Sequence, residues 1–215
     1  PMPVGDGEML DSLGNVKDKK VSQTGIDASI VVPDNSKLVF PSLFHMGALD
    51  WAPNQEGILW FLENCWTRIR KKYPELCFHI AGRNAPQWLI DKLNVDGVIF
   101  EGEVPDAYQF MNSKAVMIVP LFSGSGMRIK IIEGMALGKS IVTTSIGAEG
   151  IDVTDGENVI LANDATGFVD AVFNLLEDRD RFKRIGRNAT LFIQQNFDNL
   201  AISKKLIGFY KQYIK

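Results

Sequence analysis

The chain has 215 residues, of which 46% are hydrophobic and 23% are charged, and its formal net charge is −3 at pH 7. This balance is typical of a globular protein with one domain, or with one domain and an attached segment. It provides no bulk positive charge for nucleic acid, and no apolar run approaches the roughly 20 residues of a membrane span. We therefore expect no nucleic-acid partner and no transmembrane segment.

In chain order, residues 1–36 show little apolar periodicity apart from a short predicted strand at 28–32, and regular patterning begins at residue 37. From there the pattern predicts a strand at 38–46, a helix at 53–72, a strand at 76–81, a helix at 86–93, a strand at 97–100, a helix at 106–111, a strand at 115–120, a helix at 127–137, strands at 140–143 and 158–161, and helices at 165–177, 178–195 and 197–214.

The order of these elements predicts an α/β fold. Strands alternate with helices, and the strands are short and uniformly apolar, which is expected when both faces of a sheet are covered. We predict a Rossmann-like, doubly wound parallel sheet, in which ligands bind beyond the carboxyl ends of the strands. The loops at that edge are residues 47–54, 82–84, 101–105, 123–126 and 145–150.

The cysteines indicate neither a disulfide framework nor a zinc site. Cys65 and Cys77 lie in apolar runs, the chain has two histidines, and no C-x-x-C motif is present. We predict that both thiols are buried and reduced, as in a cytoplasmic protein, and we expect no metal.

A loop of small residues follows the fourth regular strand and precedes a helix pattern. It consists of Ser123, Gly124, Ser125 and Gly126, followed by Met127. Four small residues leave backbone N–H groups bare near a helix start, and these groups together with the helix dipole favour an anion. The alternative interpretation is that the glycines only turn the chain.

Charged residues after this loop favour a ligand. Arg128 and Lys130 place two cations within one turn, as a diphosphate requires. Glu133 lies further along the same helix, where a carboxylate can accept hydrogen bonds from sugar hydroxyls. Together these residues predict a site for a nucleoside diphosphate that carries a sugar.

Other phosphate sites fit less well. A dinucleotide site requires G-x-G-x-x-G after the first strand, whereas this loop lacks the third glycine and follows the fourth strand. No G-x-x-x-x-G-K-[ST] motif of a P-loop is present. A receiver-like domain requires several clustered acids, and Asp50 alone does not provide them.

The loop sequences resemble those of a known family. They are G-A-L-D after the first strand, G-R-N after the second, G-E-V-P-D after the third, and then the glycine loop with E-G-M-A-L-G and S-I-G-A-E-G. In this order they resemble the C-terminal half of family 4 glycosyltransferases of the GT-B fold, over about residues 24–214. The resemblance implies one of two Rossmann-like domains, with the reaction in the cleft between them.

This resemblance also implies an activity. Such enzymes transfer a sugar from a nucleotide-sugar donor with retention of anomeric configuration, and they need no metal or other cofactor. The C-terminal domain binds the donor, while the N-terminal domain supplies most of the acceptor site. Protein cations and amides offset the charge of the leaving diphosphate. Hexosyl transfer in polysaccharide or lipid-linked glycan synthesis is the family-level expectation, in the cytoplasm or at the membrane periphery.

The same resemblance implies a domain division. Residues 1–36, with the segment K-K-V-S-Q-T-G-I-D, correspond to the tail of an N-terminal domain and the inter-domain linker, and residues 37–215 correspond to the donor-binding domain with its crossover helix. We expect the N-terminal domain to be a partner in cis, and the fragment alone to have little activity. Self-association is a further expectation, because apolar residues of the last helix would lose their cover: Leu200, Leu206, Phe209, Tyr210 and Tyr213.

The site residues follow from the matched motifs. Glu133 matches a glutamate that holds the ribose, and Ser125 stands where the family has a second glutamate, which contacts the donor sugar. Ala48 and Asn54 stand where the family has an arginine and a lysine. Arg128 and Lys130 replace them as catalytic cations, as in a branch with the signature G-x-G-x-R-x-K-x-x-E. The expected substrate-binding residues are Gly47, Arg83, Glu103, Val104, Ser123, Gly124, Ser125, Gly126, Met127 and Glu133.

Two alternative functions remain open at this point. The departures at Ala48, Asn54 and Ser125 would suit a non-catalytic binding or assembly module. A GT-B epimerase acting on UDP-sugars would require acids and a histidine at the inter-domain edge. His45 and His79 lie inside apolar strands, and we expect both to be packed or hydrogen-bonded core residues.

Overall fold

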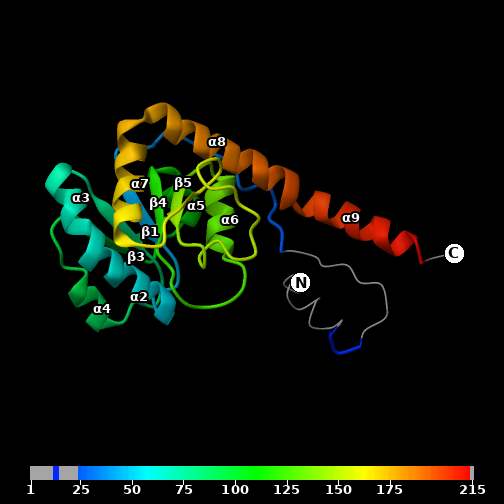
Figure 1. Ribbon diagram of the computed structural model, residues 1–215, viewed down its shortest axis with the longest axis horizontal. Coiled ribbons are helices and arrows are strands. Elements are labelled where there is room, and N and C mark those ends of the chain that lie inside the picture. The colour runs from blue at the N-terminus through cyan, green and yellow to red at the C-terminus, as the bar shows by residue number, and fades with distance from the viewer. Residues whose placement is uncertain (1–11, 15–23, 214–215) are drawn as a thin grey trace.

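The computed structural model describes residues 12–14 and 24–213 of the chain. A six-stranded sheet lies between two layers of helices, with strand order β3-β2-β1-β4-β5-β6 and every pairing parallel (Figure 1). The strands are β1 (Leu43–Met46), β2 (Phe78–Ala81), β3 (Val98–Gly102), β4 (Val116–Val119), β5 (Ser140–Thr143) and β6 (Ile160–Leu161). The expected α/β, doubly wound class is confirmed.

The helices follow the predicted order. They are α2 (Ala52–Phe61), the π-helical segment η1 (Leu62–Trp66), α3 (Thr67–Lys72), α4 (Gln87–Lys92), α5 (Ala107–Asn112), α6 (Ile129–Ala136), α7 (Ala165–Glu177), α8 (Arg179–Asn196) and α9 (Asn199–Lys211). The helix predicted at 53–72 corresponds to α2, η1 and α3 in direct succession. None of the helices in the described part of the chain is both long and apolar enough to cross a membrane.

Two hydrophobic cores cover the two faces of the sheet. Successive strand residues point to opposite faces, so Val116 and Ile118 enter one core while Met117 and Val119 enter the other. Side chains of α2, η1, α3, α4 and α7 fill the first core, and those of α5, α6 and the second half of α8 fill the second. Burial on both faces explains why the strands are uniformly apolar.

The strand predicted at 28–32 is wrong, because this segment forms a turn. The carboxylate of Asp27 accepts from the backbone N–H of Ser29 at 2.9 Å. The Asp27 carbonyl accepts from the N–H groups of Ile30 and Val31, both at 3.1 Å. These local bonds replace the ladder bonds that a strand would make.

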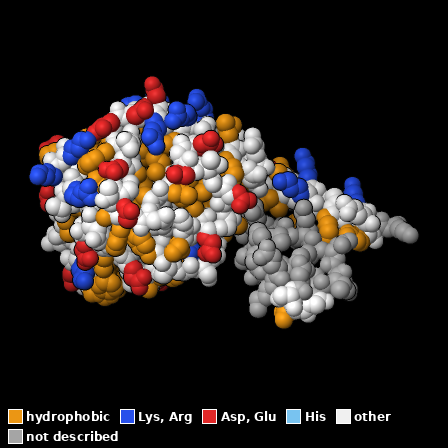
Figure 2. All heavy atoms as spheres, in the orientation of Figure 1, with side chains coloured by type: hydrophobic (Ala, Val, Ile, Leu, Met, Phe, Trp, Pro, Cys, Tyr) orange, Lys and Arg blue, Asp and Glu red, His pale blue; other side chains and the backbone are white. Residues whose placement is uncertain are grey.

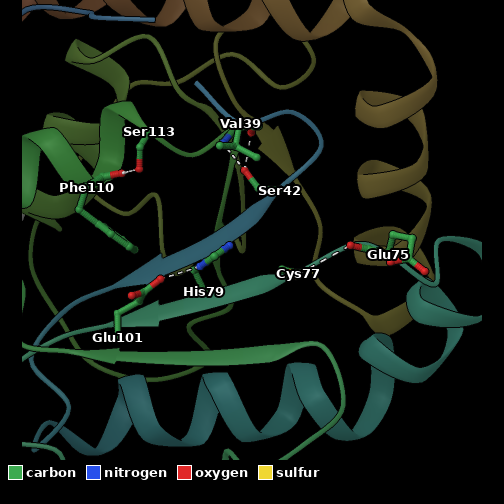
Figure 3. A network of polar contacts seen from close by, with 9 residues as sticks. Val39, Ser42, Glu75, Cys77, His79, Glu101, Phe110 and Ser113 are labelled. Atoms are coloured by element: carbon green, nitrogen blue, oxygen red, sulfur yellow. Dashed lines mark hydrogen bonds and ion pairs between the residues drawn. The ribbon is translucent and has the colours of Figure 1, made fainter. Parts of the chain in front are cut away.

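The first regular strand also begins later than predicted, at Leu43 rather than at residue 38. The hydroxyl of Ser42 donates to the carbonyl of Val39 at 2.7 Å (Figure 3), and the Val39 N–H donates to Ser113. Pro41 has no N–H to contribute to a ladder. The segment before β1 is therefore a loop that is fixed by specific hydrogen bonds.

The cysteine prediction is correct in part. Both thiols are free, and Cys65 is buried between η1 and α7. Cys77 is only half-buried, because it precedes β2 and lies beside the turn that contains Glu75 (Figure 3). The expected burial is thus wrong for Cys77.

Helix α9 projects from the body of the domain (Figure 1). None of its described residues is buried, and the exposed fractions of Leu200, Ile207 and Tyr210 are 71%, 53% and 59%. The expected exposure is confirmed for Leu200, Tyr210 and Tyr213, whereas Leu206 and Phe209 are half-buried, and self-association remains a prediction. Most of the predicted N-terminal tail, including residues 15–23, lies outside the described residues.

Candidate functional site

A cavity of about 250 Å³ lies at the carboxyl edge of the sheet. The loops after β1, β2 and β3 form one wall, and α6, which follows β4, forms the other. Its lining residues are Met46, Gly47, Ala48, Gly82, Arg83, Glu103, Val104, Met111, Lys130 and Glu133. This is the point where the strand order reverses between β1 and β4, the usual ligand position in an open parallel sheet.

Two glycines allow the loops of this wall to meet. A Cβ atom on Gly82 would lie 1.8 Å from the carbonyl oxygen of Gly47, so that no larger residue fits at position 82 without moving the backbone. The Gly47 N–H donates to Ala81 at 3.2 Å, which extends the parallel ladder just beyond the strands. The cavity therefore has a wall of closely packed backbone.

Lys130 is a buried cation on the opposite wall. Its Nζ donates to Oδ1 of Asn54 at 2.5 Å and lies 3.4 Å from Nε2 of His45. Burial, followed by the nearby positive charge of Arg128, lowers the pKa of Lys130 to about 7. No carboxylate of the described residues forms an ion pair with Lys130. An ammonium has three N–H groups, so one remains for a ligand in the cavity.

The tautomer of His45 follows from its contacts. Nδ1 lies 2.8 Å from the carbonyl oxygen of Ile118, and a carbonyl can only accept, so Nδ1 carries the proton. The ring is fully buried, and burial lowers its pKa well below 6.5, which keeps it neutral. The Nε2 lone pair is therefore free to accept from Lys130. The expectation that His45 is a hydrogen-bonded core residue is confirmed.

Asn54 supplies the second acceptor for Lys130. Its Nδ2 donates to the carbonyl of Ala48 at 2.8 Å, which orients the amide with Oδ1 towards the lysine. Asn54 is 3% exposed and lies in the first turn of α2. Asn54 is thus a neutral acceptor for the cation of α6, and the carbonyl of Ala48 orients it.

Glu133 lies three residues after Lys130 on α6 and lines the same cavity. The hydroxyl of Tyr108 on α5 donates to its Oε1 at 3.0 Å. Burial raises the pKa of Glu133, and the Tyr108 hydrogen bond partly opposes that rise. No group of the described residues donates to the second carboxylate oxygen, so it can accept from a ligand hydroxyl.

Arg128 lies beneath the glycine loop rather than in the cavity lining. It is 6% exposed, and its Nη1 donates to the carbonyls of Ser125, at 2.6 Å, and Gly126. The guanidinium carbon lies 5.4 Å from the ring centre of Trp51. Its Nε and Nη2 have no hydrogen-bond partner in the described structure. Two N–H-bearing nitrogens of a buried cation therefore remain unsatisfied.

The glycine loop has the bare amides that the sequence predicts. No backbone N–H from Ser123 to Met127 donates to another described group, and Gly124 and Gly126 have φ values of +96° and +84°. However, α6 begins at Ile129, not at residue 127, because Arg128 has an extended backbone. The loop amides consequently precede the helix instead of forming its first turn.

The structure brings about half of the predicted site residues together. The cavity is lined by Gly47, Arg83, Glu103, Val104, Lys130 and Glu133. The others lie outside its lining: Ser123, Gly124, Ser125, Gly126, Met127 and Arg128. Sequence reasoning missed the roles of His45, Asn54 and Tyr108, whose contacts with α6 come from other elements.

His79 has a different environment. Its Nδ1 lies 2.7 Å from Oε1 of Glu101 on the neighbouring strand β3 (Figure 3), and it does not line the cavity. Burial lowers the pKa of His79, while the Glu101 contact opposes that change. The expected hydrogen bond is confirmed, whereas the expected core position is wrong, because His79 is only half-buried.

Comparison with known proteins identifies a family that this chain matches. Residues 40–178 match the description "Glycosyl transferases group 1". An uncharacterized 44.6 kDa protein in the cps region of Klebsiella pneumoniae is 27% identical over 167 residues, covering 74% of this chain and 43% of that protein. The chain thus spans less than half the length of this curated relative.

Solved structures share the fold. An Anabaena protein, HepE, in complex with UDP aligns with a TM-score of 0.76 at 18% identity, over 96% of this chain and 61% of that one. The C-terminal domain of a glycosyl transferase group 1 family protein from Francisella tularensis aligns with a TM-score of 0.64 at 17% identity, over 81% of this chain and 100% of that one. These similarities support the Rossmann-like half of a GT-B fold.

Proposed function

Since the chain belongs to the glycosyl transferases group 1 family, we propose that this domain holds the nucleotide-sugar donor of a retaining glycosyltransferase. The enzyme transfers a hexosyl-type sugar from an NDP-sugar to a glycan or lipid-linked acceptor. The observation that carries the proposal is the buried Lys130, which faces the cavity with two neutral acceptors and no carboxylate partner among the described residues.

The charge of this site favours a diphosphate. A buried cation without a counter-ion is costly, and a bound anion removes most of that cost. The positive charge of Arg128 is close enough to lower the pKa of Lys130, so an anion near both would be stabilised by both. The bare amides between Ser123 and Met127 lie next to Arg128 and provide further donors.

The other cavity residues suit a nucleoside. Glu133 has a carboxylate oxygen available for ribose hydroxyls, and Tyr108 fixes the carboxyl group. Arg83, Glu103 and Val104 lie on the opposite wall, where backbone groups can contact the edge of a base. UDP, which the Anabaena protein binds, is the first nucleotide to test.

In the proposed reaction, the cations of this site stabilise the charge that develops on the leaving diphosphate. The bond between the anomeric carbon and the β-phosphate oxygen breaks, and the leaving oxygen gains negative charge, which Lys130 and Arg128 stabilise. An acceptor hydroxyl forms the new bond to the anomeric carbon on the same face of the sugar, and its proton passes to the leaving β-phosphate oxygen, so that the products are the glycosylated acceptor and the nucleoside diphosphate. In this proposal protein cations neutralise the diphosphate, and no cofactor takes part.

An N-terminal domain completes the cleft in this proposal. It supplies the acceptor site and covers the apolar side chains of α9, of which Leu200 is 71% exposed. The 215 residues alone are then expected to bind the donor but to transfer little sugar, and α9 can mediate self-association. The full enzyme would act in the cytoplasm or at the membrane periphery.

A non-catalytic donor-binding module is the second candidate, and Ser125 favours it. This position has no carboxylate to contact the donor sugar. Sugar transfer by a longer chain that includes the N-terminal domain would exclude this candidate. An epimerase is less consistent with the site, because Nε2 of His45 already accepts from Lys130.

Titration calorimetry with a panel of UDP- and GDP-sugars tests donor binding. We expect one nucleotide series to bind the wild type, and Lys130→Met to weaken that binding by at least about tenfold. Lys114→Met is the matched control, since Lys114 is half-buried at the opposite edge of the sheet, just before β4. Unchanged affinity in Lys130→Met, with both variants folded, would refute the proposed role of Lys130.

A further inference from the structure

A second cavity, of about 500 Å³, lies at the amino edge of the sheet, opposite the donor site. It is bounded by the segment before β1, by the turn at Gly138 and Lys139 that precedes β5, and by one face of α8. No residue lines both this cavity and the donor cavity. Its volume is in the range of cavities that hold small organic ligands.

Close packing of α8 on the sheet forms this cavity. A Cβ atom on Gly186 would lie 2.2 Å from the carbonyl oxygen of Gly138, so the helix rests directly on the turn before β5. The hydroxyl of Thr190 lies 3.3 Å from the carbonyl oxygens of Met135 and Ala136 at the end of α6. These contacts hold the adjacent helix face over the cavity.

That face carries a row of cations. Arg179, Lys183 and Arg187 are spaced four residues apart, so they lie on the same side of α8, and all three line the cavity. None of them forms an ion pair with a described carboxylate, and no Asp or Glu lines the cavity. The row is therefore not neutralised by its neighbours.

The positive charge at this cavity contrasts with the negative charge of the whole chain. The chain has a net charge of −3, whereas residues 179–187 contain the cations Arg179, Arg181, Lys183, Arg184 and Arg187 against the single carboxylate Asp180. Figure 2 shows Lys and Arg side chains gathered on the surface near the α7–α8 junction of Figure 1, with carboxylates beside them. Within residues 179–187 the five cations outnumber the one carboxylate, and this local excess favours an anionic ligand.

Two of the cations at this cavity are held in place. The guanidinium of Arg179 lies 3.7 Å from the ring centre of Phe40, as in a cation–π contact. Nζ of Lys139 donates to the carbonyls of Asn112 and Lys114, each at 3.2 Å. The nearby carboxylate of Asp34 favours the charged form of Lys139 and opposes the lowering of its pKa by burial. Arg179 and Lys139 therefore lose less entropy when an anion binds than freely mobile side chains would.

Apolar side chains continue the same cavity. Leu38 and Phe182 line it, and Leu191 is the next residue of the helix face after Arg187, with an exposed fraction of 48%. A ligand that places its anionic group near Lys183 and Arg187 would rest its apolar part on Leu191. The lining therefore suits a molecule with both properties.

We propose that this cavity is a second binding site, for an organic phosphate that carries an apolar body. A phosphate matches the cation row because guanidinium groups bind its oxygens in pairs. The same chemistry is present in an anionic lipid headgroup and in a free amphiphilic phosphate. The site is distinct from the donor site, because the two cavities share no lining residue and lie at opposite edges of the sheet.

The test compares two double variants of equal charge change. Lys183→Glu with Arg187→Glu removes two cations of the cavity, whereas Arg184→Glu with Lys205→Glu alters exposed cations that do not line it. The probes are dihexanoyl phosphatidic acid in solution, vesicles of phosphatidylglycerol and phosphatidylcholine, and vesicles of phosphatidylcholine alone. Melting temperatures verify folding, and if the first pair does not fold, Lys183→Gln with Arg187→Gln is compared with Arg184→Gln and Lys205→Gln.

We expect the wild type to bind a phosphate probe, and the cavity variant to bind at least about tenfold more weakly while the control does not. Saturable binding of the soluble probe would identify a free phosphate as the source, and binding only to the anionic vesicles would identify the headgroup. Equal losses in both double variants, or no binding of either phosphate probe by the wild type, would overturn the proposal. Donor titrations are not part of this test, so its failure and that of the proposed function are distinguishable.

Discussion

Nζ of Lys130 lies 3.4 Å from Nε2 of His45, and the imidazole is held in the accepting tautomer by its bond to the carbonyl of Ile118. With Asn54 as the other acceptor, the buried ammonium has only neutral partners among the described residues. The site is thus arranged around a cation that an incoming anion would neutralise. Because an anion binds the protonated lysine best, this arrangement makes donor affinity depend on pH.

Donor affinity should fall as pH rises through about 7. The pKa of Lys130 is lowered from 10.5 to about 7 in the free protein, so the lysine loses its proton above that pH, and an anionic donor prefers the protonated form. Of the charged or titratable groups around it, Arg128 stays protonated, His45 stays neutral because its pKa is well below 6.5, and Glu133 has a raised pKa.

Calorimetry with UDP-glucose from pH 6 to 8.5 measures this effect, since each phosphorus of the donor has one strongly acidic oxygen that stays ionised over this range. Above pH 7 the affinity should approach a decrease of about tenfold per pH unit. Titrations in two buffers of different ionisation enthalpy should show proton uptake at pH 8. A flat profile in the wild type, or the same slope in Lys130→Met, would contradict this account.

His45→Leu should weaken UDP-glucose binding by about tenfold, since it removes one of the two acceptors that position Lys130. The midpoint of the pH profile should also shift to lower pH, because the ammonium form loses a hydrogen bond. His79→Leu is the matched control, with a strand histidine that bonds to Glu101 outside the cavity. Identical profiles for His45→Leu and the wild type would show that His45 has only a packing role.

Most of the fold could be predicted from the sequence, because apolar runs and helical periodicity report burial directly. The errors occur where local hydrogen bonds compete with strand pairing. Asp27 bonds to its own turn, and Ser42 bonds to Val39 before β1 begins. The periodicity of apolar residues does not reveal such side-chain hydrogen bonds, yet these bonds determine where a helix or strand begins and ends.

The candidate site was less predictable. Lys130 and Glu133 are three residues apart on one helix, so their common face follows from the spacing. The partner of Lys130, His45, lies 85 residues away on β1, and only the sheet register brings it to α6. Arg128 turns back to the loop carbonyls because its backbone is extended, which the spacing of charges does not reveal.

Glu133→Ala should weaken UDP by about tenfold and 2′-deoxy-UDP by less, because the carboxylate is expected to accept from a ribose hydroxyl. Tyr108→Phe should have a smaller effect in the same direction, since it removes only the bond that orients Glu133. Parallel titrations of the two nucleotides measure the difference, with the exposed Glu157→Ala as control. Equal losses for both nucleotides would indicate a structural role for Glu133.

Arg128→Ala should abolish most donor binding, with a loss of at least about tenfold. It removes a cation beside Lys130 and also the bonds that hold the carbonyls of Ser125 and Gly126. Titration with UDP-glucose measures the loss, and Arg184→Ala, on the exposed side of α8, controls for net charge. Wild-type affinity in Arg128→Ala would remove Arg128 from the site.

The most direct measurement is a crystal of the protein soaked with UDP-glucose and, separately, with a GDP-sugar. We expect density for one donor in the cavity between Lys130 and the loops after β1 and β2, with a diphosphate oxygen within ion-pair distance of Nζ of Lys130. The ribose should contact Glu133. A donor bound elsewhere, or an empty cavity at saturating concentrations of both donors, would show that this cavity is not the donor site.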